Sequence, residues 1–323
     1  MGKRLVFLGV VFCVSLLGIA GEKDEAKKDS IAKAEFQLQP DIEFTAHLDV
    51  IITQLMKGFE VNYSDLSELN VYNYPKDSIP IVDDSTLKSR LEILNEKTPF
   101  AFGYNKRVHA FVNLYAVKRR ELSSKTMGLG QLYFPLIEEE LDKNDMPIEL
   151  KYLAVVESAL NPTARSVAGA KGLWQFMYTT GKIYDLKVNS YYDERNDPYK
   201  STKAACGYLS YLHNIYGDWN LALAAYNCGP GNVNKAIRRS GGKKDYWEIY
   251  PYLPRETRGY VPAFIAVNYV FNYGAEHNIY PRTPPTTFHE TDTIQVTNRI
   301  AFTHLAKVLK LSFVDVQYLN PEY

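Results

Sequence analysis

A single glutamate, Glu157, stands in the pattern expected of a general acid. Three of its neighbours at helical spacing are apolar: Leu153, Ala154 and Leu160. Apolar surroundings and the negative end of a helix dipole both disfavour the ionised form, so we expect the pKa of Glu157 to rise by about one unit or more. Such a carboxyl keeps a proton that it can donate near neutral pH. The alternative is a solvated carboxylate, or one paired with Lys151 or Arg165.

A glycine-bearing turn follows Glu157 and carries groups that suit a sugar. Residues 166–175 contain the hydroxyl of Ser166, the indole of Trp174 and the amide of Gln175. Groups of these kinds orient a polar ligand that has flat apolar faces. A buried acid followed by such a loop indicates a carbohydrate-binding site.

The helix that carries Glu157 has both a start signal and a stop signal. Asp145 is a good N-cap, and Pro147 suits the first turn of a helix. Asn161 precedes a proline, which disfavours the α region for that residue. We therefore expect the helix to begin at Asp145 and to stop at Asn161, with Glu157 in its last turn.

Two further helices are expected to bring side chains to the same place. Asp197, followed by a proline, caps the start of the first one. Residues 219–227 are apolar on nearly every side, which is typical of a buried helix, and they end with Tyr226 and Asn227 just before Gly229. A side chain at such a helix end is directed into a cleft. The alternative for Tyr226 is simple core filling.

A last apolar helix is expected over residues 260–273, directly after Glu256 and Thr257. A carboxylate is favoured at a helix start by the dipole. Glu256 could therefore only anchor this helix, pairing with Arg255 or Arg258, or it could border the site.

These residues form four motifs that resemble, in order, those of the soluble lytic transglycosylases, a family that shares the goose-type lysozyme fold. The motifs are Glu157-Ser158, Gly172-Leu-Trp-Gln175, Ala225-Tyr226-Asn227 with Gly229-Pro-Gly231, and Glu256-Thr257 with Tyr260-Val261. The resemblance covers roughly residues 146–273. The flanking pattern, Tyr133-Phe-Pro and a later LysM-like fragment, is similar to the membrane-bound lytic murein transglycosylase D subgroup.

The resemblance implies a mainly α fold and a set of roles. The fold would be a lysozyme-like helical catalytic domain with an N-terminal helical extension and a small C-terminal α+β LysM-like fragment. Glu157 would be the catalytic acid and base, and Ser158 and Glu256 would support the site from behind. The substrate would be the glycan strands of peptidoglycan, cleaved at the β-1,4 bond between MurNAc and GlcNAc. The implied substrate-binding residues are Ser166, Gln175, Tyr226, Asn227 and Tyr260.

The absence of a second carboxylate close to Glu157 in the sequence favours a reaction without water. Glycosidases that hydrolyse usually pair two carboxylates, yet residues 158–184 contain no Asp or Glu. Glu157 would protonate the glycosidic oxygen and then, as carboxylate, accept the proton of the C6 hydroxyl of the same muramic acid. That hydroxyl would attack its own C1 and give a 1,6-anhydromuramoyl end. A lysozyme-like muramidase and a catalytically silent peptidoglycan-binding protein are the alternatives.

The first twenty residues are predicted to be an export signal. Lys3 and Arg4 precede an apolar run over residues 5–19, and the charged segment 22–29 follows. The run is short for a bilayer span, so we expect cleavage near Ala20 and a location in the periplasm or cell envelope. A retained N-terminal anchor is the alternative, and membrane association stays open.

The rest of the chain is predicted to divide at changes of composition. Residues 21–135 would form a flexible segment and an N-terminal helical extension that packs on the catalytic domain, residues 136–280. Residues 281–287 read as a proline-rich linker, and residues 288–323 as a partial LysM-like module.

Two local predictions concern these flanking parts. Residues 128–135 contain two glycines and a proline, and are expected to form a loop. In the C-terminal fragment, residues 294–296 are expected to form a strand and residues 302–309 and 313–319 two short helices. The usual Gly-Asp-Thr-Leu of a LysM repeat is replaced there by Asn298-Arg-Ile-Ala301, which weakens the expectation of glycan binding.

Composition and spacing exclude several other kinds of function. The 323 residues are 46% hydrophobic with a net charge of +0, so no basic footprint points to a nucleic acid. No His-Glu-x-x-His spacing and no phosphate-binding glycine loop occur, so neither a metal, a nucleotide nor another cofactor is expected.

Cys206 and Cys228 are the cysteines that would remain after signal cleavage. An exported compartment permits disulfides, and the two residues lie on consecutive predicted helices. A Cys206–Cys228 disulfide is therefore expected, with two separate buried thiols as the alternative.

Overall fold

The computed structural model describes residues 69–323, and the structural statements below concern this part of the chain. Its regular elements are helices, joined by turns and three isolated β-bridges, which confirms the mainly α prediction. None of these helices is both long and apolar enough to span a bilayer. The export signal predicted for residues 1–20 lies outside the described residues.

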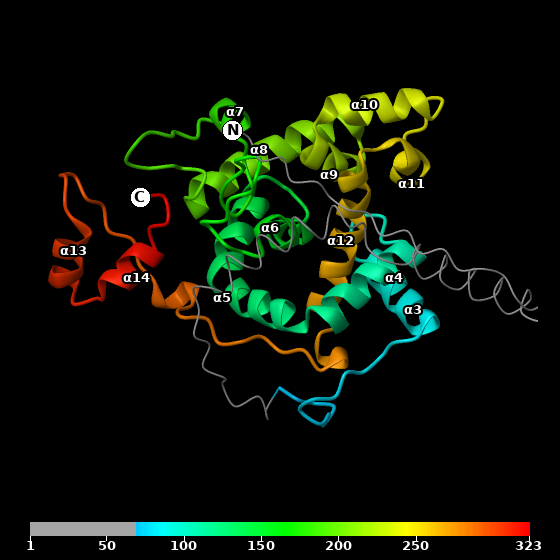
Figure 1. Cartoon of the computed structure of the whole chain (residues 1–323), viewed down its shortest axis with the longest axis horizontal. Helices are drawn as coiled ribbons and strands as arrows, with labels where there is room; N and C mark the ends of the chain where they lie inside the picture. Colours follow the sequence, from blue (N-terminus) through cyan, green and yellow to red (C-terminus); the bar gives the residue numbers. More distant parts are fainter. Residues whose placement is uncertain (1–68) are drawn as a thin grey trace, which may run out of the picture. The chain divides into compact units, whose positions relative to one another are not determined.

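The helices of the described residues are shown in chain order in Figure 1. The longer ones are α3 (Asp84–Asn95), α4 (Lys106–Asn113), α5 (Arg120–Lys143), α6 (Lys151–Ser158), α7 (Tyr178–Ile183), α8 (Pro198–Tyr216), α9 (Trp219–Cys228), α10 (Pro230–Arg239), α11 (Tyr246–Ile249), α12 (Arg255–Asn272), α13 (Phe302–Leu309) and α14 (Phe313–Tyr318). The short ones are a π-helical turn η1 (Leu114–Lys118) and the 3-10 turns η2 (Ile148–Leu150), η3 (Tyr250–Tyr252), η4 (Ala275–His277) and η5 (Phe288–Glu290).

Helix α12 is the central element of the core. Residues 259–270 are all buried, so the helix has no solvated face along most of its length. It packs against α6 and α9, which carry Glu157 and Asn227, and against α4 of the extension. The extension is also tied to α12 by Arg90, whose guanidinium donates to the Tyr269 hydroxyl at 3.0 Å. The helical extension therefore packs on α12, the helix that also contacts α6 and α9.

Helices α8 and α9 form where their capping residues predict. The carboxylate of Asp197 accepts hydrogen bonds from the backbone of Tyr199 at 2.9 Å and of Lys200 at 3.0 Å. Helix α8 ends at Gly217, whose φ of 65° is the left-handed conformation that favours glycine. Helix α9 begins at the cap residue Asp218 and is buried from residue 220 to residue 225, as its apolar sequence predicts.

The loop predicted for residues 128–135 is wrong, because helix α5 runs unbroken through it. Glycine and proline lower helix propensity locally, but tertiary packing outweighs that preference here. A Cβ added at Gly128 would lie 1.9 Å from the carbonyl oxygen of Arg282, so the glycine lets two backbones approach closely. What looked like a turn signal is a packing requirement of a helix.

The C-terminal residues also differ from the prediction. Helices α13 and α14 form near the predicted positions, but residues 294–296 have no strand, so the α+β LysM-like fragment is not confirmed. The end of the chain packs on the loop after α7. The backbone of Asp193 donates to Glu322 O at 2.7 Å, and the Asn196 amide donates to Pro321 O at 3.2 Å.

Candidate active site

Glu157 lies in the last turn of α6, as predicted, although both ends of that helix differ from the prediction. Asp145 has a φ of 51° and is not an N-cap; the chain instead enters α6 through the 3-10 turn η2, whose cap is Pro147. Helix α6 ends at Ser158, because the next two residues, Ala159 and Leu160, adopt positive φ values of 53° and 58°. The chain therefore makes a sharp turn two residues after Glu157.

The carboxyl of Glu157 is held in a protonated state by its surroundings. The residue is 7% exposed. Burial raises the pKa of Glu157 to about 8; the hydrogen bond from Tyr260 opposes this rise and the charge of Glu256 adds to it. The predicted upward shift is thus present, and burial is its main cause. Near neutral pH, Glu157 carries a proton that it can transfer.

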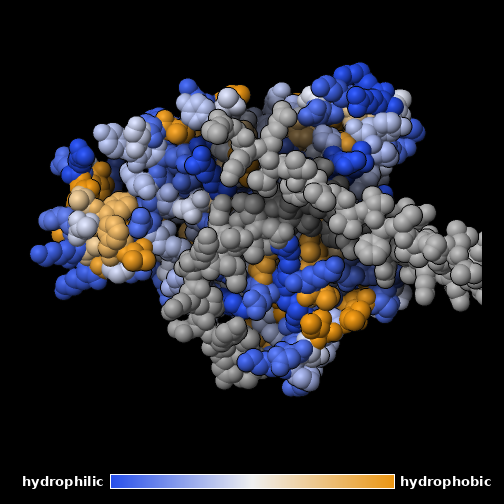
Figure 2. All heavy atoms as spheres, viewed as in Figure 1, coloured by the Kyte–Doolittle hydropathy of each residue, from blue (hydrophilic) through white to orange (hydrophobic). Residues whose placement is uncertain are grey.

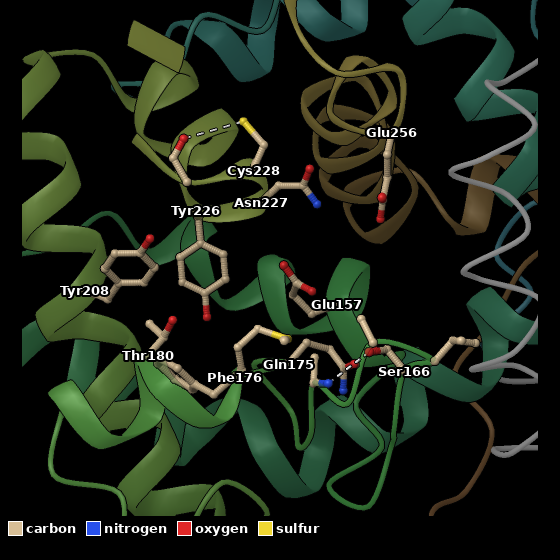
Figure 3. A pocket seen from close by; sticks show the side chains of 15 residues that line it. Glu157, Ser166, Gln175, Phe176, Thr180, Tyr208, Tyr226, Asn227, Cys228 and Glu256 are labelled. Atoms are coloured by element: carbon tan, nitrogen blue, oxygen red, sulfur yellow. Dashed lines mark hydrogen bonds between the residues drawn. The ribbon is translucent and has the colours of Figure 1, made fainter. Parts of the chain in front are cut away.

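A cavity of about 670 Å³ opens in front of Glu157 (Figure 3). In this view Glu157 lies between Asn227 on one side and Gln175 on the other. The wall comes from the end of α6, the loop after it, α7, α8, the end of α9 and the start of α12. The lining residues are Glu157, Ser166, Val167, Ala168, Ala170, Gln175, Phe176, Met177, Thr180, Tyr208, Tyr226, Asn227, Cys228, Gly229 and Glu256.

Gln175 lines the cavity and holds a buried acceptor oxygen that has no hydrogen-bond partner. Its amide nitrogen donates to the carbonyls of Gly172 at 2.9 Å and Ala164 at 3.2 Å, which fixes the orientation of the side chain. Its other amide atom, Oε1, is buried without a hydrogen-bond partner. A buried unpaired acceptor is costly to the fold. Gln175 also has a φ of 48°, a rare conformation for a residue with a side chain.

Ser166 and Asn227 also line the cavity, and each has one fixed contact. The Ser166 hydroxyl oxygen accepts from the backbone of Ala170 at 3.0 Å. Asn227 accepts from the Thr257 hydroxyl at 2.8 Å, and in Figure 3 its amide nitrogen lies on the side that faces Glu157. Both side chains are thereby oriented before any ligand arrives.

The ring of Tyr226 lines the cavity, whereas its hydroxyl makes a hydrogen bond within the protein. That hydroxyl donates to Trp174 O at 2.8 Å. The ring lies beside Tyr208, with centroids 5.2 Å apart, and both rings line the cavity. Tyr226 is therefore a cavity residue, as predicted, but its phenol oxygen is occupied.

The structure reverses the placement expected for Tyr260 and Glu256. Tyr260 was expected to contact the substrate, but it is 1% exposed, does not line the cavity, and donates its hydroxyl hydrogen to Glu157 from behind. Glu256, expected behind the site, is exposed and lines the cavity. Arg258 does not pair with Glu256, because its guanidinium donates to the carbonyls of Leu253 and Pro251.

Ser158 supports the site without lining it. Its fully buried hydroxyl donates to Ala154 O at 3.0 Å and to Leu173 O at 2.9 Å, and so ties α6 to the loop. Trp174 has the same kind of structural role. Its buried indole donates to the Thr202 hydroxyl of α8 at 2.9 Å.

A buried ion cluster clamps the loop that carries Ser166 and Gln175. The Arg195 guanidinium makes two hydrogen bonds to Asp193, at 2.9 and 2.7 Å, and also donates to the carbonyls of Gly169 and Phe176. Lys171 of the loop pairs with Asp193 at 2.9 Å. Burial raises the pKa of Asp193, but the bonds from Arg195 and Lys171 outweigh it and lower the pKa. The cluster therefore stays ionised and intact near neutral pH.

The expected disulfide is absent, and both Cys206 and Cys228 are free thiols. Cys206 is fully buried in α8, near Glu140 of α5, whereas Cys228 lies at the cavity wall beside Thr257 of α12. Consecutive helices bring the two residues into neighbouring elements, but the thiols face different partners. Burial raises the pKa of both thiols, to about 12 for Cys206.

Sequence reasoning assigned no site role of their own to several residues that the structure brings to the site, and Tyr208 and Thr257 are two of them. Tyr208 of α8 lines the cavity, and Thr257 orients Asn227. Thr257 was visible as part of a motif, but Tyr208 gave no signal because an aromatic residue on an amphipathic helix is most often core. Among residues 69–323, no group of three or more His, Cys, Asp or Glu side chains is placed to hold a metal ion.

The raised pKa of Glu157 predicts how stability changes with pH. Between the ordinary pKa of 4.5 and about 8, the folded chain keeps a proton that the unfolded chain has released. Folding stability from this group is therefore full at low pH and falls as pH rises through this window, by about 1.4 kcal/mol for each pH unit. Glu157→Gln lacks the titration, so its free energy of unfolding relative to wild type should increase by a few kcal/mol from pH 4 to pH 8. Urea unfolding at pH 4, 6 and 8 measures this; a difference that stays constant with pH contradicts it.

The close approach at Gly172 predicts a sensitive position in the loop. A Cβ there would lie 1.8 Å from Arg195 O, and the φ is +85°. Gly169 has a similar φ of +87° but open space around it. Gly172→Ala should therefore reduce the free energy of unfolding by about 1–3 kcal/mol more than Gly169→Ala, which carries only the backbone strain. Equal losses in urea unfolding would mean that the Arg195 backbone moves freely.

Comparisons with known proteins agree with the motifs and the geometry. Residues 134–249 match the family model of the transglycosylase SLT domain. The chain is 36% identical over 220 residues to membrane-bound lytic murein transglycosylase D of Escherichia coli strain K12, covering 67% of this chain and 47% of that protein. It is 32% identical over 171 residues to the soluble lytic murein transglycosylase of the same strain, covering 47% of this chain and 26% of that protein.

A solved structure is also similar. The 70 kDa soluble lytic transglycosylase of Escherichia coli aligns with 80% of this chain and 45% of its own, at 20% sequence identity and a TM-score of 0.41. The chain spans about half the length of the first of these sequence relatives. With the sequence matches and the motifs of the cavity together, residues 134–249 are a transglycosylase SLT domain.

Proposed function

We propose that this chain is a peptidoglycan lytic transglycosylase that cleaves the MurNAc–GlcNAc β-1,4 bond without water. One observation carries the proposal: a buried glutamate, protonated near neutral pH and bonded to Tyr260, faces a cavity with a free amide acceptor. The relatives named as murein transglycosylases support the substrate.

The first step of the proposed reaction uses Glu157 as a general acid. Its proton goes to the glycosidic oxygen that joins C1 of MurNAc to the next sugar. The C1–O bond then breaks, GlcNAc leaves with a new hydroxyl, and positive charge develops at C1. The pKa of about 8 means that the group holds its proton until the leaving oxygen needs it.

The second step uses the same group as a base. Glu157, now a carboxylate, accepts the proton of the C6 hydroxyl of the same MurNAc, and the C6 oxygen bonds to C1. The product is a 1,6-anhydromuramoyl end, and Glu157 recovers its proton. Because the nucleophile belongs to the bound sugar, a folded ring conformation replaces a second protein carboxylate.

In this proposal, the oriented polar groups of the cavity bind the substrate. Gln175 Oε1 would accept from a sugar hydroxyl or amide, and Ser166 and Asn227 would bind neighbouring polar groups. The rings of Tyr208 and Tyr226 offer flat faces for the sugar. Tyr260 would act only through Glu157, since it does not line the cavity.

A lysozyme-like muramidase is the second candidate, because Glu256 lines the same cavity. An exposed carboxylate there could activate a water molecule against C1. The sequence alone did not favour this option, since Glu256 was expected to lie behind the site.

The relatives also support a location in the cell envelope, as the predicted export signal does.

The product distinguishes the two candidates. Mass spectrometry of peptidoglycan digested with the purified chain should show muropeptides that are lighter than reducing ends by one water. Glu157→Gln should lower the rate by about 100-fold to 10000-fold, since it removes the transferable proton. Glu256→Gln should leave the anhydro product unchanged. A digest dominated by reducing muramic acid ends, and abolished by Glu256→Gln, would establish a hydrolase.

The hydrogen bond from Tyr260 predicts a shift in the pH profile. That bond lowers the pKa of Glu157, so its removal in Tyr260→Phe should raise the pKa further. The acid is active while protonated, and the alkaline limb of kcat/KM should therefore move to higher pH. Tyr269→Phe, a buried tyrosine of the same helix that bonds Arg90, is the control and should not move the limb. A limb that moves to lower pH in Tyr260→Phe would contradict the assignment.

A further inference from the structure

Helix α10 carries a basic face that no contact within the described residues uses. Lys235, Arg238 and Arg239 lie three and four positions apart on one side of the helix and are all exposed. The opposite side, with Val233 and Ala236, is buried in the core. Two more exposed lysines, Lys243 and Lys244, follow the helix.

This face concentrates positive charge in a chain whose net charge is zero. Residues 235–244 contain five basic and no acidic residues, whereas the whole chain has 37 basic and 37 acidic ones. Lys243 pairs with Glu248 at 3.1 Å. The other four have no ion pair within the described residues, and Figure 2 shows a hydrophilic surface over α10. We name Lys235, Arg238, Arg239 and Lys244 the α10 basic face.

Helix α10, which carries the basic face, begins at the edge of the cavity. Gly229 is both the N-cap of α10 and a lining residue of the cavity. At 1.5 Å per residue, Lys235 lies about 9 Å and Arg239 about 15 Å along the helix from that edge. A peptide of five residues reaches at most about 17 Å. A peptide attached to a sugar at that edge can therefore extend past Lys235 as far as Arg238 and Arg239.

We propose that the α10 basic face binds the acidic peptides attached to the muramic acid of the substrate. This rests on the proposed function, because it takes peptidoglycan as the ligand of the cavity. The peptides carry free carboxylates, which lysine and arginine side chains attract. An anionic lipid surface would also be attracted to such a face, but it would not need the continuity between the face and the cavity.

The experiment measures binding, so that it does not depend on turnover. The full chain carrying Glu157→Gln is mixed with insoluble peptidoglycan, either intact or stripped of its peptides by an amidase, and the bound fraction is measured by sedimentation. The test variant adds K235Q, R238Q and R239Q. The control variant adds K97Q, K118Q and K307Q, which are exposed lysines away from α10 and remove the same charge.

The test variant should bind intact peptidoglycan about five- to tenfold more weakly than the parent, from three lost contacts of the strength of exposed ion pairs. The control variant should bind like the parent. On stripped peptidoglycan, all three should bind alike. About 0.5 M salt should remove the advantage of the parent on the intact material, because it screens exposed charges. Thermal melting of the variants confirms that each is folded.

Two outcomes would overturn the proposal. The test variant could bind intact peptidoglycan as well as the parent, or lose as much affinity for the stripped material as for the intact one. Sedimentation with phosphatidylglycerol vesicles, compared with phosphatidylcholine vesicles, tests the lipid alternative. If the test variant loses affinity only for the anionic vesicles, and not for intact peptidoglycan, the peptide proposal is overturned. Failure of the proposed function is seen separately, as a wild-type chain that releases no soluble fragments from peptidoglycan.

Discussion

The burial of Glu157 against Tyr260 is the interaction on which the rest of the site depends. A carboxyl in water is ionised near neutral pH and has no proton to give. Here burial holds the proton in place, while the single hydrogen bond from Tyr260 fixes the carboxyl and keeps its pKa from rising still further. The fold thereby accepts a less stable packing in return for a reactive group, which is a common relation between stability and activity.

Helix α12 makes this burial possible, and two of its side chains fix groups on opposite sides of the cavity. One turn of the helix supplies both Tyr260, behind Glu157, and Thr257, which orients Asn227 across the cavity. The helix is itself enclosed by α4, α6 and α9, so the N-terminal extension, through α4, helps to shield it from water. On the other wall, Arg195 and Asp193 hold the loop of Gln175 with ionic hydrogen bonds, in addition to the apolar packing of Leu173 and Trp174. Helix α12 and the clamped loop thus lie on two sides of the cavity.

The sequence predicts those parts of the site that local rules determine. The position of Glu157 in a last turn, the cap at Asp197 and the burial of α9 all follow from capping and periodicity, and the structure confirms them. The exchange of Tyr260 and Glu256 could not be predicted, since residues four positions apart share one face of a helix and the sequence does not tell which turn of α12 lies at the cavity. The predicted Cys206–Cys228 disulfide was wrong for a related reason. The packing of two helices side by side does not determine which way each side chain faces. The helical Gly128 depends on an approach by Arg282, far away in sequence.

The unpaired oxygen of Gln175 has a consequence for the choice of inhibitors. A compound that fills the cavity with apolar groups alone offers no donor to this buried acceptor, which then stays unpaired. Glu157 near neutral pH is a donor, not an anion, so a cationic group placed beside it gains little. The useful fragment is therefore neutral, with an N–H or O–H directed at Gln175 and an acceptor directed at Glu157. An amide or a hydroxylated ring meets both needs, and screening collections can be filtered for that pair before any compound is made.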